Sequence, residues 1–486
     1  MEKPHAVFDR DWEWAALSEF AADRSSGATL GIVAGRRRQG KTLLLQELCA
    51  ATGGFYFAAT EATEAESLRL VAHAHAQHTG LPVPLALSSW EQACDALLAL
   101  GAGSDIGVPV VLDEFPYLCR ASPALPSIIQ KALGPRRSER TGSRSRLILC
   151  GSALTFMGGL LSGAAPLRGR AGLDLTVPTF DPRTAAAFWN IDDWPLAFRV
   201  HAVVGDTPAY RREYVRGDTP VDASDFDAWV CRTVLNPASP LHKEARYLLA
   251  EEADIRDPAL YHSVLAAVAD GHSTRGAIAR YVGRPDDRLR HPITVLEDAG
   301  LIVREQDALR RARSRYRIAE PLITFYHAVI RPERSRLQRP EAAAAVWSDS
   351  QERFASNVLG PNFEQLCRWW TATHASPHTL GGQPTRVGSG VINDARQKAR
   401  HELDVVATDS SGRILAIGEA KVGTVMNEGQ LSRLERIRDL LVQTGHDAGD
   451  ARLLCCSARG FTPPLQQAAT TGRATLVDLA RIYTGT

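Results

Sequence analysis

The sequence predicts an α/β protein that begins with a parallel-sheet domain, continues through a helical region and ends in a second α/β domain. Short apolar segments alternate with helical patterns through about residue 150, and strand-like segments stop after about residue 180. A second alternation of strands and helices follows residue 354. These regions agree with the roughly three domains that a chain of 486 residues is expected to form.

The composition excludes several classes of protein. Hydrophobic residues make up 44% of the chain and charged residues 23%, which argues against a disordered chain, a collagen-like chain or a coiled-coil rod. No apolar run reaches the ~18 residues that cross a bilayer, and the first ten residues lack the apolar core of a signal peptide. We therefore expect a cytoplasmic protein with no membrane partner. The net charge of +1 means that only local basic clusters can indicate nucleic acid.

Four apolar segments predict the strands of the first domain, at residues 28–34, 55–57, 108–112 and 147–150. Helical patterns lie between them, at residues 43–49, 65–78 and 90–100. Strands that alternate with helices favour a parallel sheet covered on both faces.

The turn after the first strand fits the pattern GxxxxGK[ST] at every fixed position, with Gly35, Arg36, Arg37, Arg38, Gln39, Gly40, Lys41 and Thr42. It follows a strand and opens a helix, so its backbone N–H groups can surround the phosphates of ATP at the positive end of that helix. We expect Lys41 to reach the β- and γ-phosphates and the Thr42 hydroxyl to bind Mg²⁺. The three arginine side chains are expected to form a solvated face, because the loop backbone binds the phosphates.

Acidic and polar residues end two other strands of this predicted sheet. Asp113 and Glu114 follow residues 108–112, at the edge where α/β sheets place their ligands. We expect Asp113 to hold Mg²⁺ through water and Glu114 to act as general base on the attacking water. Ser152 follows residues 147–150 and is placed to sense the γ-phosphate.

These features together resemble the AAA+ and STAND ATPases, and residues 5–330 resemble the archaeal-type ATPase family. The resemblance rests on the phosphate loop and on residues 8–10 (Phe-Asp-Arg), 112–117 (Leu-Asp-Glu-Phe-Pro-Tyr), 149–152 (Leu-Cys-Gly-Ser), 166–170 (Pro-Leu-Arg-Gly-Arg) and 205–208 (Gly-Asp-Thr-Pro). Asp206 departs from the glycine that is usual in the family. The resemblance implies that Arg168 or Arg170 neutralises γ-phosphate charge, in its own or a neighbouring subunit; a surface arginine that covers apolar area is the alternative.

Residues 261–318 read as three helices followed by a hairpin, an order that resembles a winged helix. Ser273 or Thr274 is expected to cap the second helix and Asp286 or Asp287 the third. Basic side chains gather on the third helix and at the hairpin tip, which suits contact with nucleic-acid phosphates: Arg288, Arg290, His291, Arg310, Arg311, Arg313 and Arg315. The alternative is a module that serves only to pack or to cover another domain.

The strands predicted at residues 402–408 and 414–419 carry charged residues that can converge. Period-2 alternation places Glu419 and Lys421 on one face, and Asp404 lies on the neighbouring strand. Two carboxylates can hold Mg²⁺ while the lysine orients a water or stabilises developing charge. Glu364, at the start of a preceding helix, offers a further metal ligand. The alternative is a hairpin with an ion pair between Glu419 and Lys421.

This arrangement resembles the PD-(D/E)xK nuclease superfamily, with Asp404, Glu419 and Lys421 at its motif positions, and archaeal-type ATPases commonly end in such a domain. Arg396, Lys398 and Arg400 precede the motif and could hold a nucleic-acid backbone. A third strand is predicted at residues 451–455.

The chain is thus divided into a P-loop ATPase core (1–182), a helical lid (183–256), a winged helix (257–330), a connector (331–353) and a restriction-endonuclease-like α/β domain (354–486). Three functions remain open: an ATPase coupled to a metal-dependent nuclease that acts on DNA more than RNA, an ATP-gated DNA-binding switch without cleavage, and an ATPase that remodels protein partners. ATP and Mg²⁺ are the expected cofactors in each. A homo-oligomer is required only if an arginine acts on a neighbouring subunit.

Overall fold

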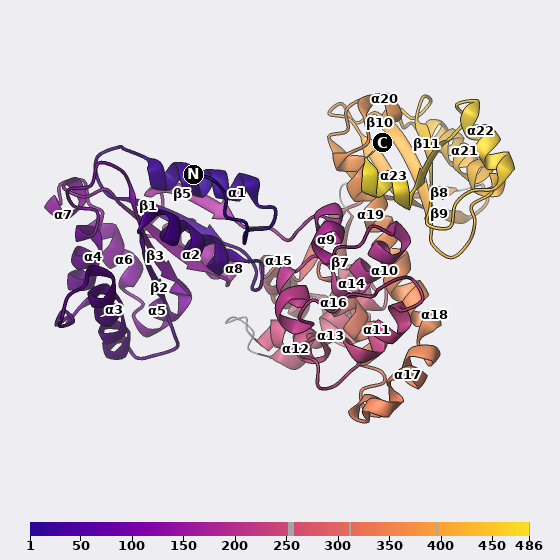
Figure 1. Ribbon diagram of the computed structural model, residues 1–486. Coiled ribbons are helices and arrows are strands. Elements are labelled where there is room, and N and C mark those ends of the chain that lie inside the picture. The colour runs from indigo at the N-terminus through magenta and orange to yellow at the C-terminus, as the bar shows by residue number, and fades with distance from the viewer. Residues whose placement is uncertain (251–256, 311–312, 395, 486) are drawn as a thin grey trace. The chain divides into compact units, whose positions relative to one another are not determined.

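Figure 1 shows the computed structural model, which describes residues 1–250, 257–310, 313–394 and 396–485. The chain forms two compact units, Met1–Thr179 (unit 1) and Phe180–Thr486 (unit 2). The predicted core ends at residue 182, close to this division, and the other predicted domains all fall in unit 2. Residues 251–256 of the predicted lid and Arg311 of the predicted hairpin tip lie outside the described residues. None of the described helices is long and apolar enough to span a membrane.

Unit 1 contains a parallel sheet with the strand order β2-β3-β4-β1-β5. Its strands are β1 (Thr29–Ala34), β2 (Phe55–Ala58), β3 (Val108–Asp113), β4 (Ser145–Gly151) and β5 (Ala171–Thr176). The first four lie where the sequence predicts strands. The fifth was missed, because β5 is an edge strand that carries Gly172 and Asp174, and most of its residues are not buried.

Helices cover both faces of this sheet. On one face lie α1 (Asp11–Ala22) and α2 (Lys41–Thr52), and on the other α3 (Glu64–Thr79), α4 (Trp90–Ala99), α5 (Phe115–Ala121) and α6 (Leu125–Ala132). Within β3, Val111 packs in the first layer while Val110 and Leu112 pack in the second. Burial on both faces explains why these strands read as continuous apolar runs. Two short helices, α7 (Ser138–Thr141) and α8 (Leu154–Gly159), flank β4.

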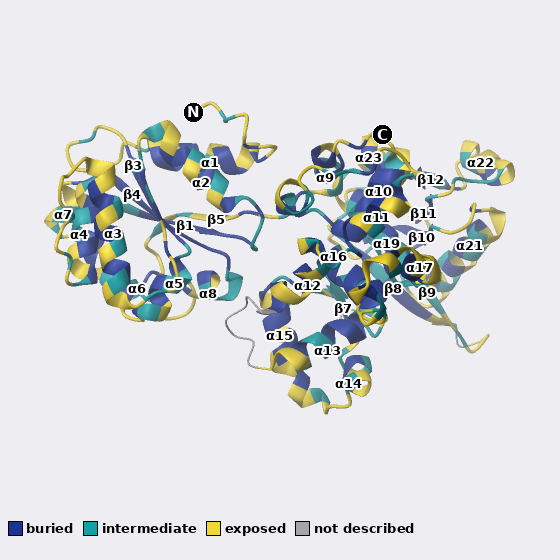
Figure 2. Cartoon of the chain, turned by 60° about the horizontal axis from the view of Figure 1, so that its bottom comes forward, coloured by how far each residue is buried: buried dark blue, intermediate teal, exposed yellow. Residues whose placement is uncertain are grey.

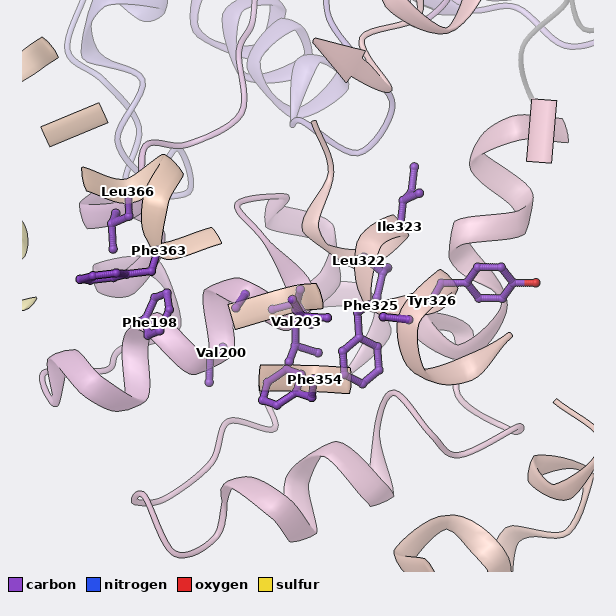
Figure 3. Close-up of a cluster of buried hydrophobic side chains, with 14 of the residues drawn as sticks. Phe198, Val200, Val203, Leu322, Ile323, Phe325, Tyr326, Phe354, Phe363 and Leu366 are labelled. Carbon is purple, nitrogen blue, oxygen red and sulfur yellow. The ribbon is translucent and has the colours of Figure 1, made fainter. Parts of the chain in front are cut away.

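Unit 2 begins with helices that share one large apolar core. They include α9 (Pro182–Trp189), α10 (Trp194–Val204), α11 (Phe226–Arg232), α12 (Pro240–Ala250), α16 (Pro321–Phe325), α17 (Ala343–Asp349) and α19 (Gly360–Thr373). Figure 3 shows how side chains from α10, α16 and α19 meet in it, among them Phe198, Phe325 and Phe363. The predicted connector is not a free linker, because α17 lies within it and buries Val346 and Trp347 in the same core.

Three helices and a hairpin follow in the predicted order. They are α13 (Pro258–Ala269), α14 (Arg275–Val282), α15 (Arg290–Asp298), β6 (Ile302–Gln306) and β7 (Ser314–Ile318). Thr274 caps α14, as one of the two predicted alternatives. Neither predicted aspartate caps the third helix, because it begins as a 3₁₀ turn, Asp286–Leu289, in which Asp286 instead pairs with Arg275. We call residues 258–318 the helix–hairpin module.

The carboxyl-terminal domain, residues 360–485 except 395, contains a mixed sheet with the order β12-β11-β10-β9-β8. Its strands β8 (Arg386–Asp394), β9 (Ala399–Thr408) and β10 (Ile414–Lys421) are antiparallel, whereas β11 (Arg452–Ser457) and β12 (Thr475–Asp478) run parallel to β10. The sequence missed β8 and β12. Helices α19 and α23 (Leu479–Thr484) cover one face, and α21 (Glu428–Gln443) and α22 (Pro463–Thr470) the other. Figure 2 shows buried strands between helices that each expose one side. A short helix, α20 (Pro377–Leu380), precedes β8.

Candidate nucleotide and metal sites

The phosphate loop lies at the carboxyl edge of the unit 1 sheet, between β1 and α2. Gly35 has a φ of 157°, and a Cβ there would lie 2.6 Å from the carbonyl oxygen of Val177. Gly40 has a φ of 88° and precedes the first residue of α2. Both fixed glycines therefore hold backbone conformations that side chains disfavour. The loop brings the amino end of a twelve-residue helix to the sheet edge, where an anion is stabilised.

Lys41 is buried inside this loop, with 6% of its surface exposed. Its Nζ donates to the carbonyl oxygens of Gly35 at 2.6 Å and Arg36 at 2.8 Å. Burial lowers the pKa of the ammonium group, and nearby Glu114 and Asp113 oppose that shift. A phosphate oxygen would compete with these two carbonyl groups for the ammonium, at the position where the motif requires it.

Asp113 ends β3 as a buried carboxylate that accepts several hydrogen bonds. Thr42 Oγ1 donates to Asp113 Oδ2 at 2.8 Å, and the Tyr56 hydroxyl donates to the same oxygen at 2.7 Å. The backbone N–H of Glu114 donates to Oδ1 at 2.8 Å. A threonine hydroxyl beside a fixed carboxylate supplies the oxygen ligands that Mg²⁺ prefers, so Thr42 and Asp113 fit this ion.

Tyr56 is a residue of this site that the sequence did not reveal. It lies on β2, which pairs with β3 in the register Ala58 to Asp113. Burial and the neighbouring Asp113 raise the pKa of Tyr56 above its usual value, so its hydroxyl stays protonated as a donor. In the sequence, a tyrosine within a strand segment indicates only that the residue favours strands, not that it belongs to a site. The strand order, which places β2 beside β3, was the missing information.

Glu114 and Ser152, the predicted general base and sensor, contact each other. Glu114 has a φ of 52°, a left-handed conformation that is uncommon for a residue other than glycine. It precedes the first residue of α5, and Ser152 Oγ donates to its Oε2 at 3.5 Å. Strained backbone at such a position is typical of functional sites.

Two arginines predicted to belong to the site, Arg37 and Arg170, lie at different distances from the phosphate-binding edge of the sheet. Arg37 donates to the Tyr117 hydroxyl at 3.2 Å, so it contacts a side chain and does more than face solvent. Exposed Arg170 precedes β5, whose residues Ala171 and Thr176 pair with Leu30 and Ala34. This places Arg170 at the opposite edge of the sheet from the phosphate loop, about 13 Å along the strands. The alternative that Arg170 acts at the nucleotide site of a neighbouring molecule stays a prediction.

The second candidate site lies where β9 and β10 separate. The pairing of β9 with β8 shifts register between Leu403 and Val406, so β9 carries a bulge at this position, which includes Asp404. Asp404 Oδ2 accepts a hydrogen bond from the backbone N–H of Ala420 at 2.8 Å. The bulge thus directs Asp404 to the β10 backbone between Glu419 and Lys421. Bulges that re-aim a side chain are frequent next to active sites.

Glu419 is buried and held by two cations. Lys421 Nζ lies 2.9 Å from its Oε1, and Arg433 of α21 forms an ion pair with its Oε2. Arg433 also donates to the carbonyl oxygen of Glu402 at 2.9 Å. The predicted shared face of Glu419 and Lys421 is confirmed, and the sequence missed Arg433. A metal ion at Glu419 would have to replace one of these cations.

Glu364 lies on α19 near Asp404. Arg368 lies between them: its Nη1 is 3.6 Å from Glu364 Oε2 and donates to the Asp404 carbonyl oxygen at 3.0 Å. Burial and the charge of Asp404 raise the pKa of Glu364 to about 7, and burial raises that of Asp404. A divalent cation between the two carboxylates would relieve this repulsion.

The three predicted metal ligands of this domain do not form one cluster. Among the described residues no group of three or more His, Cys, Asp or Glu side chains is placed to hold a metal ion. Helices α19 and α21 cover opposite faces of the sheet. Glu364 lies on α19, whereas Glu419 pairs with Arg433 of α21, so the two glutamates are held on different sides. The residues fit a two-carboxylate site formed by Asp404 and Glu364, since these two carboxylates interact.

The hairpin of the helix–hairpin module packs against the carboxyl-terminal domain. The backbone N–H of Ala308 donates to the Ser389 carbonyl oxygen at 2.9 Å, and Arg315 lies 3.1 Å from Glu402. These contacts favour the packing alternative for the hairpin tip. Arg288 and Arg290 are exposed and have no carboxylate within ion-pair distance in the described parts of the chain, so the nucleic-acid prediction for the third helix stays open.

Comparisons with known sequences show a distant relative. The chain matches no known family profile. It is 23% identical over 334 residues to an uncharacterized protein of Methanocaldococcus jannaschii, covering 68% of this chain and 70% of that protein.

The solved structures that are similar to this chain include an ATPase and an ORC2 protein. The Walker-type ATPase PABY2304 of Pyrococcus abyssi matches with a TM-score of 0.51 and 20% identity, covering 67% of this chain and 97% of that one. The ORC2 protein of Aeropyrum pernix matches with a TM-score of 0.41 and 15% identity, covering 72% of this chain and 97% of that one. The α/β fold with a parallel five-stranded sheet, as in a Walker-type ATPase, is thereby confirmed.

Proposed function

We propose that unit 1 is a Mg²⁺-dependent ATPase of the AAA+ type. The observation that carries this proposal is the hydrogen bond that Thr42 Oγ1 donates to Asp113 Oδ2 at 2.8 Å, next to the contact between Glu114 and Ser152. Lys41 and the amino end of α2 bind the phosphates, Thr42 and Asp113 hold the ion, and Glu114 accepts a proton from the attacking water. When bound, Mg²⁺ would neutralise negative charge on the phosphates.

The test is phosphate release from ATP by the full chain. Lys41→Ala and Glu114→Gln should each abolish turnover, whereas Lys131→Ala, a matched change at an exposed lysine of α6, should leave it intact. Glu114→Gln should still bind ATP, because the general base is not needed for binding. Full turnover in Lys41→Ala would refute the assignment.

We further propose that the carboxyl-terminal domain is a metal-dependent nuclease, of the PD-(D/E)xK type, that acts on DNA in preference to RNA. The bulge at Asp404 supports this, because the Asp404 carboxylate accepts a hydrogen bond from the Ala420 backbone N–H, between Glu419 and Lys421 in the sequence. Asp404 and one glutamate would hold Mg²⁺, and Lys421 would orient the water. ATP turnover in unit 1 would gate this activity.

Cleavage of plasmid, single-stranded DNA and RNA, with Mg²⁺ or Mn²⁺ and with or without ATP, tests the proposal. Asp404→Asn should abolish cleavage, and Asp439→Asn, a matched change at an exposed aspartate of α21, should not. Lys41→Ala reports whether ATP gates it. Cleavage that persists in Asp404→Asn would refute the nuclease assignment.

One observation favours the second candidate, an ATP-gated DNA-binding switch without cleavage. Both carboxylate oxygens of Glu419 are held in ion pairs, by Lys421 and Arg433. DNA binding that falls with salt, without cleavage under any metal condition, would support that function. ATP turnover without DNA binding at low salt would point to a protein-remodelling ATPase instead.

A further inference from the structure

A basic groove lies in the carboxyl-terminal domain at the opposite sheet edge from Lys421. Its volume is about 890 Å³, and the amino ends of β10, β11 and β12 line it together with α20 and α22. Since β10 runs from Ile414 to Lys421, the groove lies about 23 Å along the strand from the candidate metal site. It is therefore a separate site.

Positive charge dominates the lining of the groove. The basic residues are Arg413, Arg438, Arg452, Arg473, Arg481 and His378, against the acids Asp447 and Asp450. Arg413 pairs with Asp409 at 3.2 Å and Arg473 with Glu435 at 2.9 Å. The other three arginines have no carboxylate within 4.0 Å among residues 1–250, 257–310, 313–394 and 396–485. A concave surface with uncompensated charge concentrates the electrostatic field and attracts anions.

Two of these unpaired arginines are held in position by the backbone. Arg481 Nη1 donates to the Leu476 carbonyl oxygen at 2.7 Å, and its guanidinium lies 5.3 Å from the centre of the Trp370 ring. Arg481 Nε is nevertheless buried and has no hydrogen-bond partner among the residues that the structure describes. Arg438 Nη1 donates to the Ala451 carbonyl oxygen at 3.4 Å. Because a guanidinium has five N–H donors, both side chains keep donors for a ligand.

We propose that this groove binds a phosphate-bearing ligand, either a nucleic-acid strand or a free mononucleotide. Planar guanidinium groups bind phosphate oxygens in pairs, so the arginines that line the groove suit such a ligand. The volume is within the range of about 300–1,000 Å³ that ligand pockets occupy. This site does not depend on cleavage at Asp404 or on ATP turnover.

Binding measurements on the full chain test the proposal. The probes are a fluorescein-labelled dT₁₂ strand, dTMP and inorganic phosphate, with EDTA present to prevent cleavage. The parent chain and all variants carry Lys41→Ala, so that binding by the phosphate loop is weakened equally in each. Arg438→Gln with Arg452→Gln should weaken binding about tenfold or more. It should also reduce the slope of log affinity against log salt by about 1.4, since each lost phosphate contact on a single strand contributes about 0.7.

The matched control is Arg436→Gln, an exposed arginine of α21 outside the groove, which should leave affinity unchanged. Competition by dTMP would identify a mononucleotide site, and its absence a strand site; both support the proposal. If the double variant melts at a lower temperature than the parent chain, the single variant Arg452→Glu replaces it in the test, because Arg452 is exposed. Unchanged affinity and salt slope in these variants, or no binding of any probe by the parent chain, would overturn it.

Discussion

Removing one hydroxyl, by Tyr56→Phe, should raise the Mg²⁺ concentration needed for ATP turnover. The Tyr56 hydroxyl donates to Asp113 Oδ2 at 2.7 Å, and its ring packs beside the core formed by α1 and α2. Phenylalanine keeps that packing and removes only the donor. A hydrogen bond to a charged group contributes about 1.5–3 kcal/mol, and losing such a partner of a metal ligand costs about 10- to 100-fold in metal affinity. We expect about tenfold, because Thr42 donates to the same oxygen.

The assay is steady-state phosphate release at saturating ATP, titrated with Mg²⁺. Binding of a fluorescent ATP analogue in EDTA should be unchanged, because the phosphate loop is intact. Tyr247→Phe, at a tyrosine 50% exposed on α12, is the matched control. An unaltered Mg²⁺ titration in a Tyr56→Phe protein of unchanged melting temperature would refute the reasoning.

Three other changes probe backbone conformation, buried charge and pH. Gly35→Ala should weaken ATP binding at least tenfold, measured by fluorescence titration, because its Cβ would lie 2.6 Å from the Val177 carbonyl oxygen. Arg146→Ala should lower the free energy of unfolding of unit 1 by about 3 kcal/mol in urea, since this fully buried guanidinium donates to three carbonyl oxygens, of Asp23, Ser25 and Gly27. Burial lowers the pKa of His327 from 6.5 to about 3. As pH falls, His327 therefore takes up a proton in the unfolded chain at a higher pH than in the folded chain. The stability of unit 2 should therefore decline by up to about 1.4 kcal/mol per pH unit from about pH 6 to 4, and His327→Gln should flatten that decline in pH-dependent melting.

The arrangement of the candidate nucleotide site follows largely from the sequence, because its parts are local. Gly35, Gly40, Lys41 and Thr42 occupy one turn, and each conformation they adopt is dictated within a few residues. Asp113 reaches them because parallel strands place their carboxyl ends at one edge of the sheet. Tyr56 and Arg170 could not be placed in this way, since their positions depend on which strands are neighbours and at which edge a residue lies.

Strands whose sequence pattern is weak could not be predicted either. β5, β8 and β12 carry glycine or are short, and only pairing with stronger neighbours makes them strands. The predicted connector likewise became core, because Trp347 finds apolar partners on α11 and α16, which lie outside the predicted connector.

By itself, the sequence determined an α/β chain with a phosphate loop, two acids at a strand end and a charged motif on a second sheet. Only the tertiary structure decided that Glu419 is held by Arg433. It also decided that Glu364 approaches Asp404 from the other face, and that the hairpin packs against β8. The physical reason is that a motif specifies side chains that are close along the chain, whereas charge pairing and metal geometry depend on side chains brought together by packing.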